Sequence, residues 1–251
     1  TVPKGKTPEG ERSGELVELP ITIYYTLRKD LASLDVRIDM ENKAENHRLR
    51  LMIPSEIREA MKSFAEGQYD VLERPIPLPD ATGFKEPPYP THPMWNFVDV
   101  SEGKEGFAVI NDGLIEYEIV DDPKRTVAIT LLRAFGTFIY NRPTPGSQCL
   151  RPLSFHFWLT PHAGNWEDAK LMDLKTRFVS PLQAMFSAPS RGNEPTRKEN
   201  FRLEGNVLFG AIKPAEDDPD LILLRFLNPH KTVQKATIQT HLPIADAKLL
   251  T

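Results

Sequence analysis

The chain has 251 residues, 40% of them hydrophobic and 26% charged, which is typical of a soluble globular protein. This length can bury a substantial core as one large domain, or as one large and one small domain. The formal net charge of -4 offers no general attraction to nucleic acid or to an anionic membrane surface, so neither is expected as a partner.

Two further features concern the cellular compartment. No apolar run approaches the roughly 20 residues that a membrane-spanning helix needs, and the N-terminal stretch lacks the apolar core of a signal peptide. Cys149 is the only cysteine, which excludes an internal disulfide and is typical of a reducing compartment. We therefore expect a cytoplasmic protein. The chain does not begin with methionine, as expected of a piece of a longer protein.

Alternation of apolar and polar residues dominates the chain and predicts strands. Their ranges, in order, are 21–27, 34–40, 49–53, 68–73, 107–110, 115–120, 127–132, 153–159, 207–212, 221–227 and 233–240. Turns rather than long helical patterns separate these strands, which favours antiparallel pairing and an all-β sandwich. Only 55–65 and 166–178 have helical periodicity, so one or two short helices are expected.

The order of these elements also predicts domain boundaries. Residues 1–14 are polar and are expected to be mobile. The main sandwich is predicted over 15–190. Polar, glycine-containing segments near its end separate the last strands, 191–251, which are expected to form a small subdomain.

Four segments occur in an order that resembles one known family. They read ENKAENHRLRLMIP from Glu41, PTHPMWNFVDVS from Pro90, GFAVINDGLIEYEIVDDPKRTVAITLLRAFG from Gly106, and PGSQCLRPLSFHFWLTPHAGNW from Pro145. Together they resemble the C-terminal β-domain of bacterial-type glycoside hydrolase family 38 α-mannosidases. The resemblance implies a large antiparallel sandwich of the galactose-mutarotase-like (supersandwich) kind.

The same resemblance implies a function shared with an absent domain. Family members are retaining α-mannosidases, whose aspartate nucleophile, acid/base carboxyl group and divalent metal, usually zinc, lie on an N-terminal catalytic barrel. This chain would then be a scaffold and one wall of the active site, with that barrel and an α-mannoside as its partners, and the resemblance also allows a homo-oligomer. The sequence has no HExxH, no Gly-x-Ser-x-Gly elbow and no phosphate-binding glycine loop. We expect no catalytic residue, metal ligand or cofactor in the chain, and no mannosidase activity from it alone.

Three residues are predicted to bind substrate. In some family members an arginine of the β-domain reaches the sugar, and Arg133 is the matching residue. A guanidinium group suits this task because its planar fork donates paired hydrogen bonds. The structural alternative is that Arg133 ends a strand and pairs with Glu116 or Asp112. Asn111 and Asp112 precede Gly113, and this sequence is typical of a tight hairpin turn. The alternative is a loop that faces the active-site cleft, in which Asp112 accepts a hydrogen bond from a sugar hydroxyl.

Two other functions remain open. A non-catalytic carbohydrate-binding module would need two exposed aromatic rings along a shallow groove, for which Trp95 and Trp158 are candidates. A sugar isomerase of the mutarotase type would need a paired histidine and glutamate to move a proton. The candidates for that pair are His92, His156 and Glu116.

Overall fold

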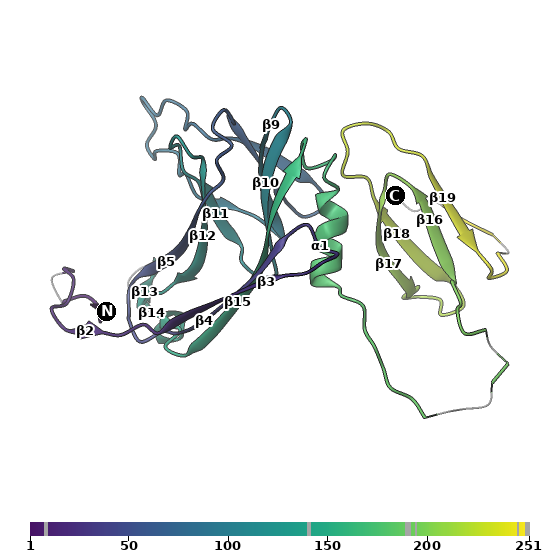
Figure 1. The fold of residues 1–251 in the computed structure, drawn as a ribbon, viewed down its shortest axis with the longest axis horizontal. Coiled ribbons are helices and arrows are strands. Elements are labelled where there is room, and N and C mark those ends of the chain that lie inside the picture. Colours follow the sequence, from purple (N-terminus) through teal and green to yellow (C-terminus); the bar gives the residue numbers. More distant parts are fainter. Residues whose placement is uncertain (8–9, 140–141, 189–191, 194, 245, 249–251) are drawn as a thin grey trace. The chain divides into compact units, whose positions relative to one another are not determined.

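Strands make up almost all of the regular structure in the computed structural model, which confirms the predicted all-β class (Figure 1). The model describes residues 1–7, 10–139, 142–188, 192–193, 195–244 and 246–248. The chain divides into two compact units, Thr1–Pro181 and Leu182–Thr251. The predicted domain boundary after residue 190 stays a prediction. No helix in the described ranges is long and apolar enough to cross a membrane.

The first unit contains two antiparallel sheets (Figure 1). In spatial order, the seven-stranded sheet comprises β3 (Ile21–Leu27), β4 (Leu34–Glu41), β15 (Pro152–Ala163), β10 (Glu105–Asn111), β9 (Phe97–Glu102), β6 (Lys62–Glu66) and β7 (Val71–Pro75). The four-stranded sheet comprises β5 (Arg48–Pro54), β12 (Thr126–Arg133), β11 (Glu116–Ile119) and β8 (His92–Pro93).

Four shorter strands and two helical segments are the other regular elements among the described residues of this unit. The strands form two ribbons, β1 (Val2–Pro3) with β2 (Leu16–Val17), and β13 (Thr137–Phe138) with β14 (Arg142–Pro143). The helical segments are the 3-10 helix η2 (Pro145–Gln148) and the α-helix α1 (Leu171–Val179). Mobility of residues 1–14 stays a prediction, although β1 pairs with β2 and the Glu45 amide donates to the Lys4 carbonyl at 2.6 Å.

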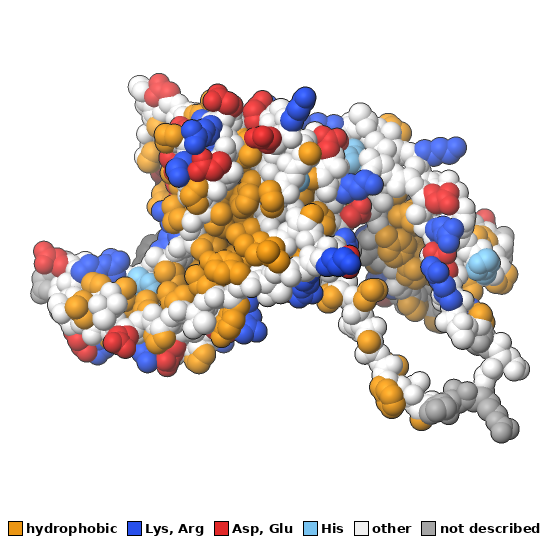
Figure 2. All heavy atoms as spheres, in the orientation of Figure 1, with side chains coloured by type: hydrophobic (Ala, Val, Ile, Leu, Met, Phe, Trp, Pro, Cys, Tyr) orange, Lys and Arg blue, Asp and Glu red, His pale blue; other side chains and the backbone are white. Residues whose placement is uncertain are grey.

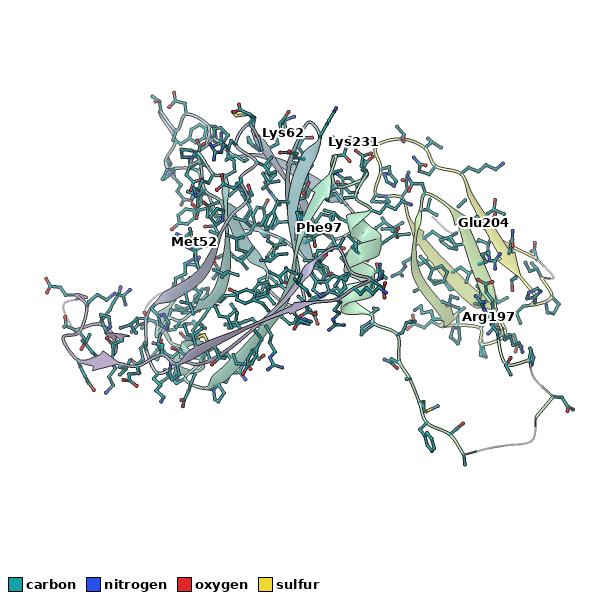
Figure 3. The ribbon with its side chains drawn as sticks, in the orientation of Figure 1. Met52, Lys62, Phe97, Arg197, Glu204 and Lys231 are labelled. Atoms are coloured by element: carbon teal, nitrogen blue, oxygen red, sulfur yellow. The ribbon has the colours of Figure 1, made fainter. Side chains whose placement is uncertain are left out.

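The hydrophobic core lies between the two sheets, where side chains fill the space (Figure 3). Successive side chains of a strand point to opposite faces, so alternate residues of each sheet enter this layer. The seven-stranded sheet contributes, among others, Val36, Ile38, Val98, Val100, Val109 and Phe157. The four-stranded sheet contributes, among others, Tyr117, Ile119, Val127 and Ile129. Burial of an apolar side chain of this size contributes about 1.5–3 kcal/mol, so this layer is the main stabilising feature.

Helix α1 covers part of the outer face of the seven-stranded sheet. Its Phe178 ring lies 4.9 Å from the Trp158 ring and 4.7 Å from the His156 ring, centroid to centroid. Both partners alternate with the core residue Phe157 and therefore point away from the core. Lys175 adds an ion pair at 2.6 Å to the buried Glu66. The helix thus protects polar as well as apolar groups of this face.

Two predictions from periodicity need correction. The helix expected over 55–65 is wrong, because residues 62–66 form β6, which lies between β7 and β9 and buries Ser63 and Ala65. Pairing on both sides outweighs a helical pattern this short. The helix expected over 166–178 is present but begins at Leu171, because the Asn165 side chain accepts hydrogen bonds from the next turn's amides.

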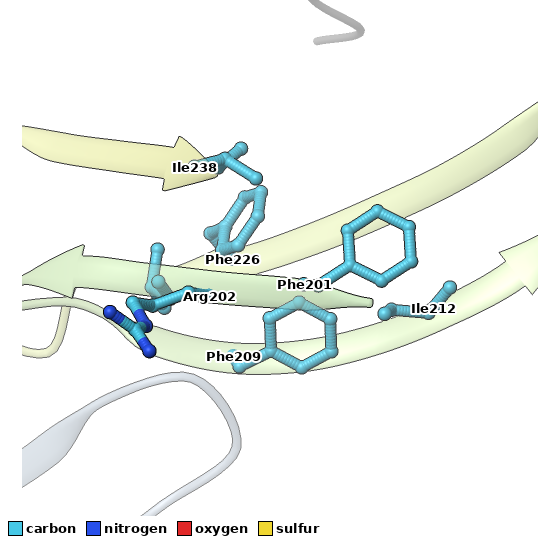
Figure 4. Close-up of a pocket in the computed structure, with 7 residues that line it drawn as sticks. Phe201, Arg202, Phe209, Ile212, Phe226 and Ile238 are labelled. Atoms are coloured by element: carbon cyan, nitrogen blue, oxygen red, sulfur yellow. The ribbon is translucent and has the colours of Figure 1, made fainter. Parts of the chain in front are cut away.

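The described residues of the second unit contain two antiparallel ribbons. They are β16 (Phe201–Gly205) with β19 (Ala236–Thr240), and β17 (Leu208–Pro214) with β18 (Ile222–Leu227). A hollow of about 260 Å³ is lined mainly by their apolar side chains, including Phe201, Phe209, Ile212, Phe226 and Ile238 (Figure 4). Phe209 and Phe226 meet edge to face at 5.4 Å, so we regard this hollow as the unit's own loosely filled core.

Candidate functional site

Three connections between the two sheets gather at one end of the first unit. Residues 42–47 join β4 to β5, residues 112–115 join β10 to β11, and residues 134–151 join β12 to β15. They lie toward the same end because β4 and β10 both run antiparallel to β15: β4 ends opposite Pro152 at the start of β15, and β10 ends opposite Phe157, five residues further along. We call this the crossover end. Connections held at one end of a rigid sandwich are a common position for binding residues.

The first of the predicted residues, Asn111, ends β10 at the crossover end. Its side-chain oxygen accepts a hydrogen bond from the Leu114 amide at 2.7 Å, and Gly113 has a φ of +93°. The predicted hairpin is wrong, since β10 and β11 belong to different sheets. The Asn111 side chain takes over the bond that a paired strand would supply, and the chain turns from one sheet to the other.

Asn111 and Asp112 have different surroundings in this turn. Asn111 is fully buried, and its Nδ2 also donates to the Asn96 carbonyl at 3.4 Å. That burial favours a structural role for Asn111. Asp112 is exposed at the tip of the turn. Contact of either residue with a substrate stays a prediction.

The third predicted residue, Arg133, belongs to a polar group on the outer face of the four-stranded sheet. We call it the arginine–glutamate cluster and define it as Arg48, Glu116, Thr130 and Arg133. Arg133 Nη2 lies 2.7 and 2.8 Å from the two carboxylate oxygens of Glu116, and Arg48 Nη2 lies 2.8 Å from Oε1. Of the two partners expected for Arg133, the structure therefore shows Glu116.

Thr130 holds the cluster together from the middle strand. Its hydroxyl donates to Glu116 Oε1 at 2.5 Å and accepts from Arg48 Nε and Nη2 at 3.0 and 2.8 Å. These groups meet because β12 pairs with β5 on one side and with β11 on the other. The register of β12 and β5 shifts between Thr130 and Leu132, and the shift places Arg133 opposite Arg48. Two guanidinium groups thus share one carboxylate.

Glu116 is ionised in this arrangement. Partial burial by itself raises the pKa of the carboxyl group, but the hydrogen bonds from Arg133 and Thr130 and the charges of Arg133 and Arg48 outweigh burial, so the pKa is lowered. A carboxylate held in this state is a poor proton donor near neutral pH. The cluster is therefore suited to binding and positioning rather than to acid catalysis.

Arg133 is the most accessible member of the cluster. Its side chain is 45% exposed, against 24% for Arg48 and 26% for Glu116. The bond to Glu116 fixes one end of the guanidinium group and leaves other N–H groups accessible to solvent. Such a group can hold a carboxylate or a pair of hydroxyl groups.

The residues considered for an isomerase lie apart. His92 pairs with Tyr117 across β8 and β11, and their rings lie 5.9 Å apart, so His92 shares the core-facing side with Tyr117. Glu116, the neighbour of Tyr117, points to the other side. His156 belongs to the seven-stranded sheet and lies 2.9 Å from Asp35. This geometry does not favour a histidine–glutamate pair.

The two candidate tryptophans of a sugar-binding groove also differ. Trp158 is buried and donates from Nε1 to Asp35 at 3.2 Å, while Trp95 is exposed. The hollow next to β3, about 380 Å³, is lined by Pro20, Thr22, Asp39, Met40, Glu41, Pro152, Leu153 and Ser154, without an aromatic ring. Within the described ranges, no group of three His, Cys, Asp or Glu side chains is arranged to hold a metal ion.

A buried amide network that the sequence did not indicate fixes the crossover end. Asn42 Nδ2 donates to the Gln148 carbonyl at 2.8 Å, and Asn42 Oδ1 lies 3.0 Å from His47 Nε2. Asn46 Oδ1 accepts from the Gly136 amide at 2.8 Å. The only sequence signal was the occurrence of Asn42 and Asn46 just after a predicted strand, since Gln148 and Gly136 are 106 and 90 residues away from them, respectively.

The family model for the glycosyl hydrolases family 38 C-terminal domain matches residues 9–137, just over half of the chain. The chain belongs to this family. The matched range contains all four members of the arginine–glutamate cluster and the turn that carries Asn111 and Asp112. The family resemblance read from the sequence is thus confirmed.

Individual relatives agree with this assignment. A putative mannosylglycerate hydrolase of Halalkalibacterium halodurans is 29% identical over 236 residues, which cover 91% of this chain and 25% of that protein. An α-mannosidase from Enterococcus faecalis V583 superposes with a TM-score of 0.77 at 25% identity, over 86% of this chain and 24% of that one. A second family 38 protein from Enterococcus faecalis has a TM-score of 0.83 at 22% identity, over 95% of this chain and 29% of that one, and shows the shared fold. The chain spans about a quarter of the length of these relatives.

Proposed function

We propose that the chain is the C-terminal β-sandwich part of a retaining α-mannosidase that hydrolyses α-mannosides. In this proposal it acts as a scaffold and as one wall of the active site, while an N-terminal barrel of the same polypeptide supplies the nucleophile, the acid/base carboxyl group and the zinc site. The observation that carries the proposal is the match of residues 9–137 to the family's C-terminal domain. The named functions of the two glycosidase relatives support it.

The chain's own part in the reaction is to bind and orient the substrate. Arg133 extends from the crossover end, and Glu116 and Thr130 limit its movement. A positioned guanidinium group donates to a sugar hydroxyl or to an acidic leaving group without losing further side-chain freedom. Asp112, exposed in the turn between β10 and β11, would accept from a sugar hydroxyl. Glu116 remains ionised and takes no part in proton transfer.

An acidic leaving group is one form of this substrate class. The curated relative is named for mannosylglycerate, whose leaving group carries a carboxylate. In the cluster, two guanidinium groups share one carboxylate, so its net charge is positive. Positive charge at the rim of a cleft favours an anionic group over a neutral second sugar.

The test compares two arginine variants in the complete polypeptide. Arg133→Ala should lower kcat/KM for an α-mannoside by about 10-fold to 100-fold, the range expected when a charged contact to the substrate is lost. Arg50→Ala is the matched control, because Arg50 makes a similar ion pair at 2.6 Å to Glu118 on the same sheet face. An equal loss of kcat/KM in both variants, or no loss in Arg133→Ala, would refute the role of Arg133.

The isolated chain provides a second test of the proposal. It should release no product from an aryl α-mannoside, because the groups that react lie on another domain. Turnover that rises in proportion to the amount of purified chain would contradict this. Heat released on titration with mannobiose, at an affinity unaffected by Arg133→Ala, would instead favour a carbohydrate-binding module.

A further inference from the structure

Strand β3 is exposed along its whole length. It forms seven antiparallel pairs with β4 and is the last strand of the seven-stranded sheet, so its other edge has no strand partner in the part of the chain that the structure describes. All seven residues, Ile21–Leu27, are exposed. Edge strands of this length usually carry a charge, a proline or a bulge that prevents further pairing. The sequence ITIYYTL has no charge or proline, and its register with β4 is regular.

One face of β3 continues the core-facing surface of its sheet. Ile21, Ile23, Tyr25 and Leu27 lie opposite Met40, Ile38, Val36 and Leu34 of β4, respectively. Val36, Ile38 and Met40 are buried in the core, whereas the four β3 residues are 47%, 41%, 64% and 81% exposed. The apolar surface of the seven-stranded sheet therefore extends one strand beyond the part that the four-stranded sheet covers.

The cover stops short because the four-stranded sheet lies toward the opposite edge. Tyr117 of that sheet contacts β6 and β7, with its hydroxyl 3.2 Å from both Ser63 Oγ and Arg74 Nη1. Its own edge strand, β5, packs on the core with Leu49, Leu51 and Ile53, and these three are only partly buried. Figure 2 shows hydrophobic side chains gathered between the sheets, in the region where Figure 1 draws β3 and β5. We call this surface the open side and define it by the four β3 residues and the three β5 residues.

We infer that the open side is the surface on which the rest of the family 38 polypeptide packs, by adding a strand to β3 that covers the apolar row. The inference rests on the proposed function, in which such a polypeptide exists. The relatives are about four times as long as this chain, so they contain ample sequence for the added segment. Backbone pairing would give this contact affinity, and alternate apolar side chains would give it specificity.

A second copy of the chain fits the open side less well. Two β3 strands paired about a two-fold axis would join two seven-stranded sheets, and each copy would bring its own four-stranded sheet in its present place. The apolar row above the paired strands would remain uncovered, and so would the β5 row. A segment from the same polypeptide is free of this constraint, and its covalent link raises its effective concentration.

The test uses amide hydrogen exchange read by mass spectrometry. The 251-residue chain is compared alone, at several concentrations, and after mixing with the rest of the polypeptide produced separately. We expect the amides of Ile21–Leu27 to exchange rapidly in the chain alone at every concentration, and to slow by about tenfold or more in the complex. Tyr25→Lys should weaken the complex by about tenfold or more, because a charge replaces an apolar contact. Thr22→Lys is the matched control, since Thr22 is an exposed residue of the opposite face of β3.

Three results would overturn the inference. They are equal effects of the two lysine variants, unchanged exchange of β3 in the complex, and protection of β3 that rises with the chain's own concentration together with a dimer mass in light scattering. Failure of the proposed function is distinguishable from these. A complex that protects β3 but hydrolyses no α-mannoside supports the inference and refutes the function, while an active complex with unprotected β3 does the reverse.

Discussion

Gly106 is the position at which a single added methyl group should cost the most stability. It lies in β10 directly opposite His162 of β15. A Cβ atom built on Gly106 would lie 2.7 Å from both ring nitrogens of His162, closer than side chains approach one another. The imidazole ring therefore occupies the space that alanine would need.

The ring has nowhere to move without breaking a buried pair. His162 Nε2 lies 2.8 Å from Asp99 Oδ1, and Asp99 is fully buried, with the Ser101 hydroxyl as its other partner at 2.7 Å. Breaking a buried pair of this kind costs about 3–5 kcal/mol, and overpacking alone costs about 1–3 kcal/mol. Gly106→Ala should therefore lower the free energy of unfolding by roughly 3–5 kcal/mol, a large part of the 5–15 kcal/mol typical of a domain.

Urea denaturation followed by tryptophan fluorescence measures this loss. All three tryptophans, Trp95, Trp158 and Trp166, lie in the first unit, so the signal reports that unit. Gly146→Ala is the matched control, because nothing lies within 4 Å of its added Cβ and its φ is not positive. The control should change stability by less than about 1 kcal/mol. Equal stability of the two variants would refute the reasoning about His162.

Three further predictions concern the crossover end and two partly buried histidines, His47 and His92. Thr130→Val should lower the free energy of unfolding by about 1–3 kcal/mol and raise the pKa of Glu116 in a carboxyl NMR titration, because the hydroxyl donates to that carboxylate; an unchanged pKa would contradict this. Asn42→Ala should cost about 2–3 kcal/mol in denaturant unfolding, since it removes the partner of a buried carbonyl and of His47, and a loss below about 0.5 kcal/mol would contradict it. Burial lowers the pKa of both His47 and His92 below 6.5, so the unfolded chain binds their protons more readily. The stability that these neutral histidines contribute is complete above the pKa of the unfolded chain and is lost as the pH falls through the pKa of the folded chain. The double variant His47→Gln/His92→Gln should therefore show a smaller decline of the free energy of unfolding between about pH 7.5 and about pH 5. An unchanged slope of the free energy of unfolding against pH would contradict this.

Strand-like runs predicted most of the longer strands of the first unit, whether exposed along their length like β3 or largely buried like β12. The run 21–27 matches β3 residue for residue, and 153–159 lies within β15. They did not predict β9, in which the polar residues Asp99 and Ser101 alternate with Val98 and Val100 but are buried like them. Nor did they predict β6, where tertiary pairing decides the conformation of a segment with mixed local preferences.

The candidate site was predictable only where its members are close in sequence. Glu116 was one of two partners expected for Arg133, and the two are 17 residues apart on paired strands. Arg48 is 82 residues from Thr130, and their contact depends on the pairing of β5 with β12 and on the register shift in β12. No local pattern encodes either feature. The exit of the chain from the seven-stranded sheet at Asn111 was hidden for the same reason, since an Asn-Asp-Gly turn is compatible with a hairpin and with a change of sheet.

The distribution of buried and exposed groups at the crossover end limits where substrate binding can lie. Asn42 and Asn111 are fully used in holding the connections together, and Glu116 is held by two arginines and a hydroxyl. Of the residues predicted to bind substrate, Arg133 and Asp112 are the two whose side chains remain accessible. The buried members fix the backbone of both, so the entropy cost of ordering these groups has been met by folding rather than by binding. Under the proposed function, a β-domain built in this way would supply positioned donors and acceptors and would leave bond breaking to the groups of the N-terminal domain.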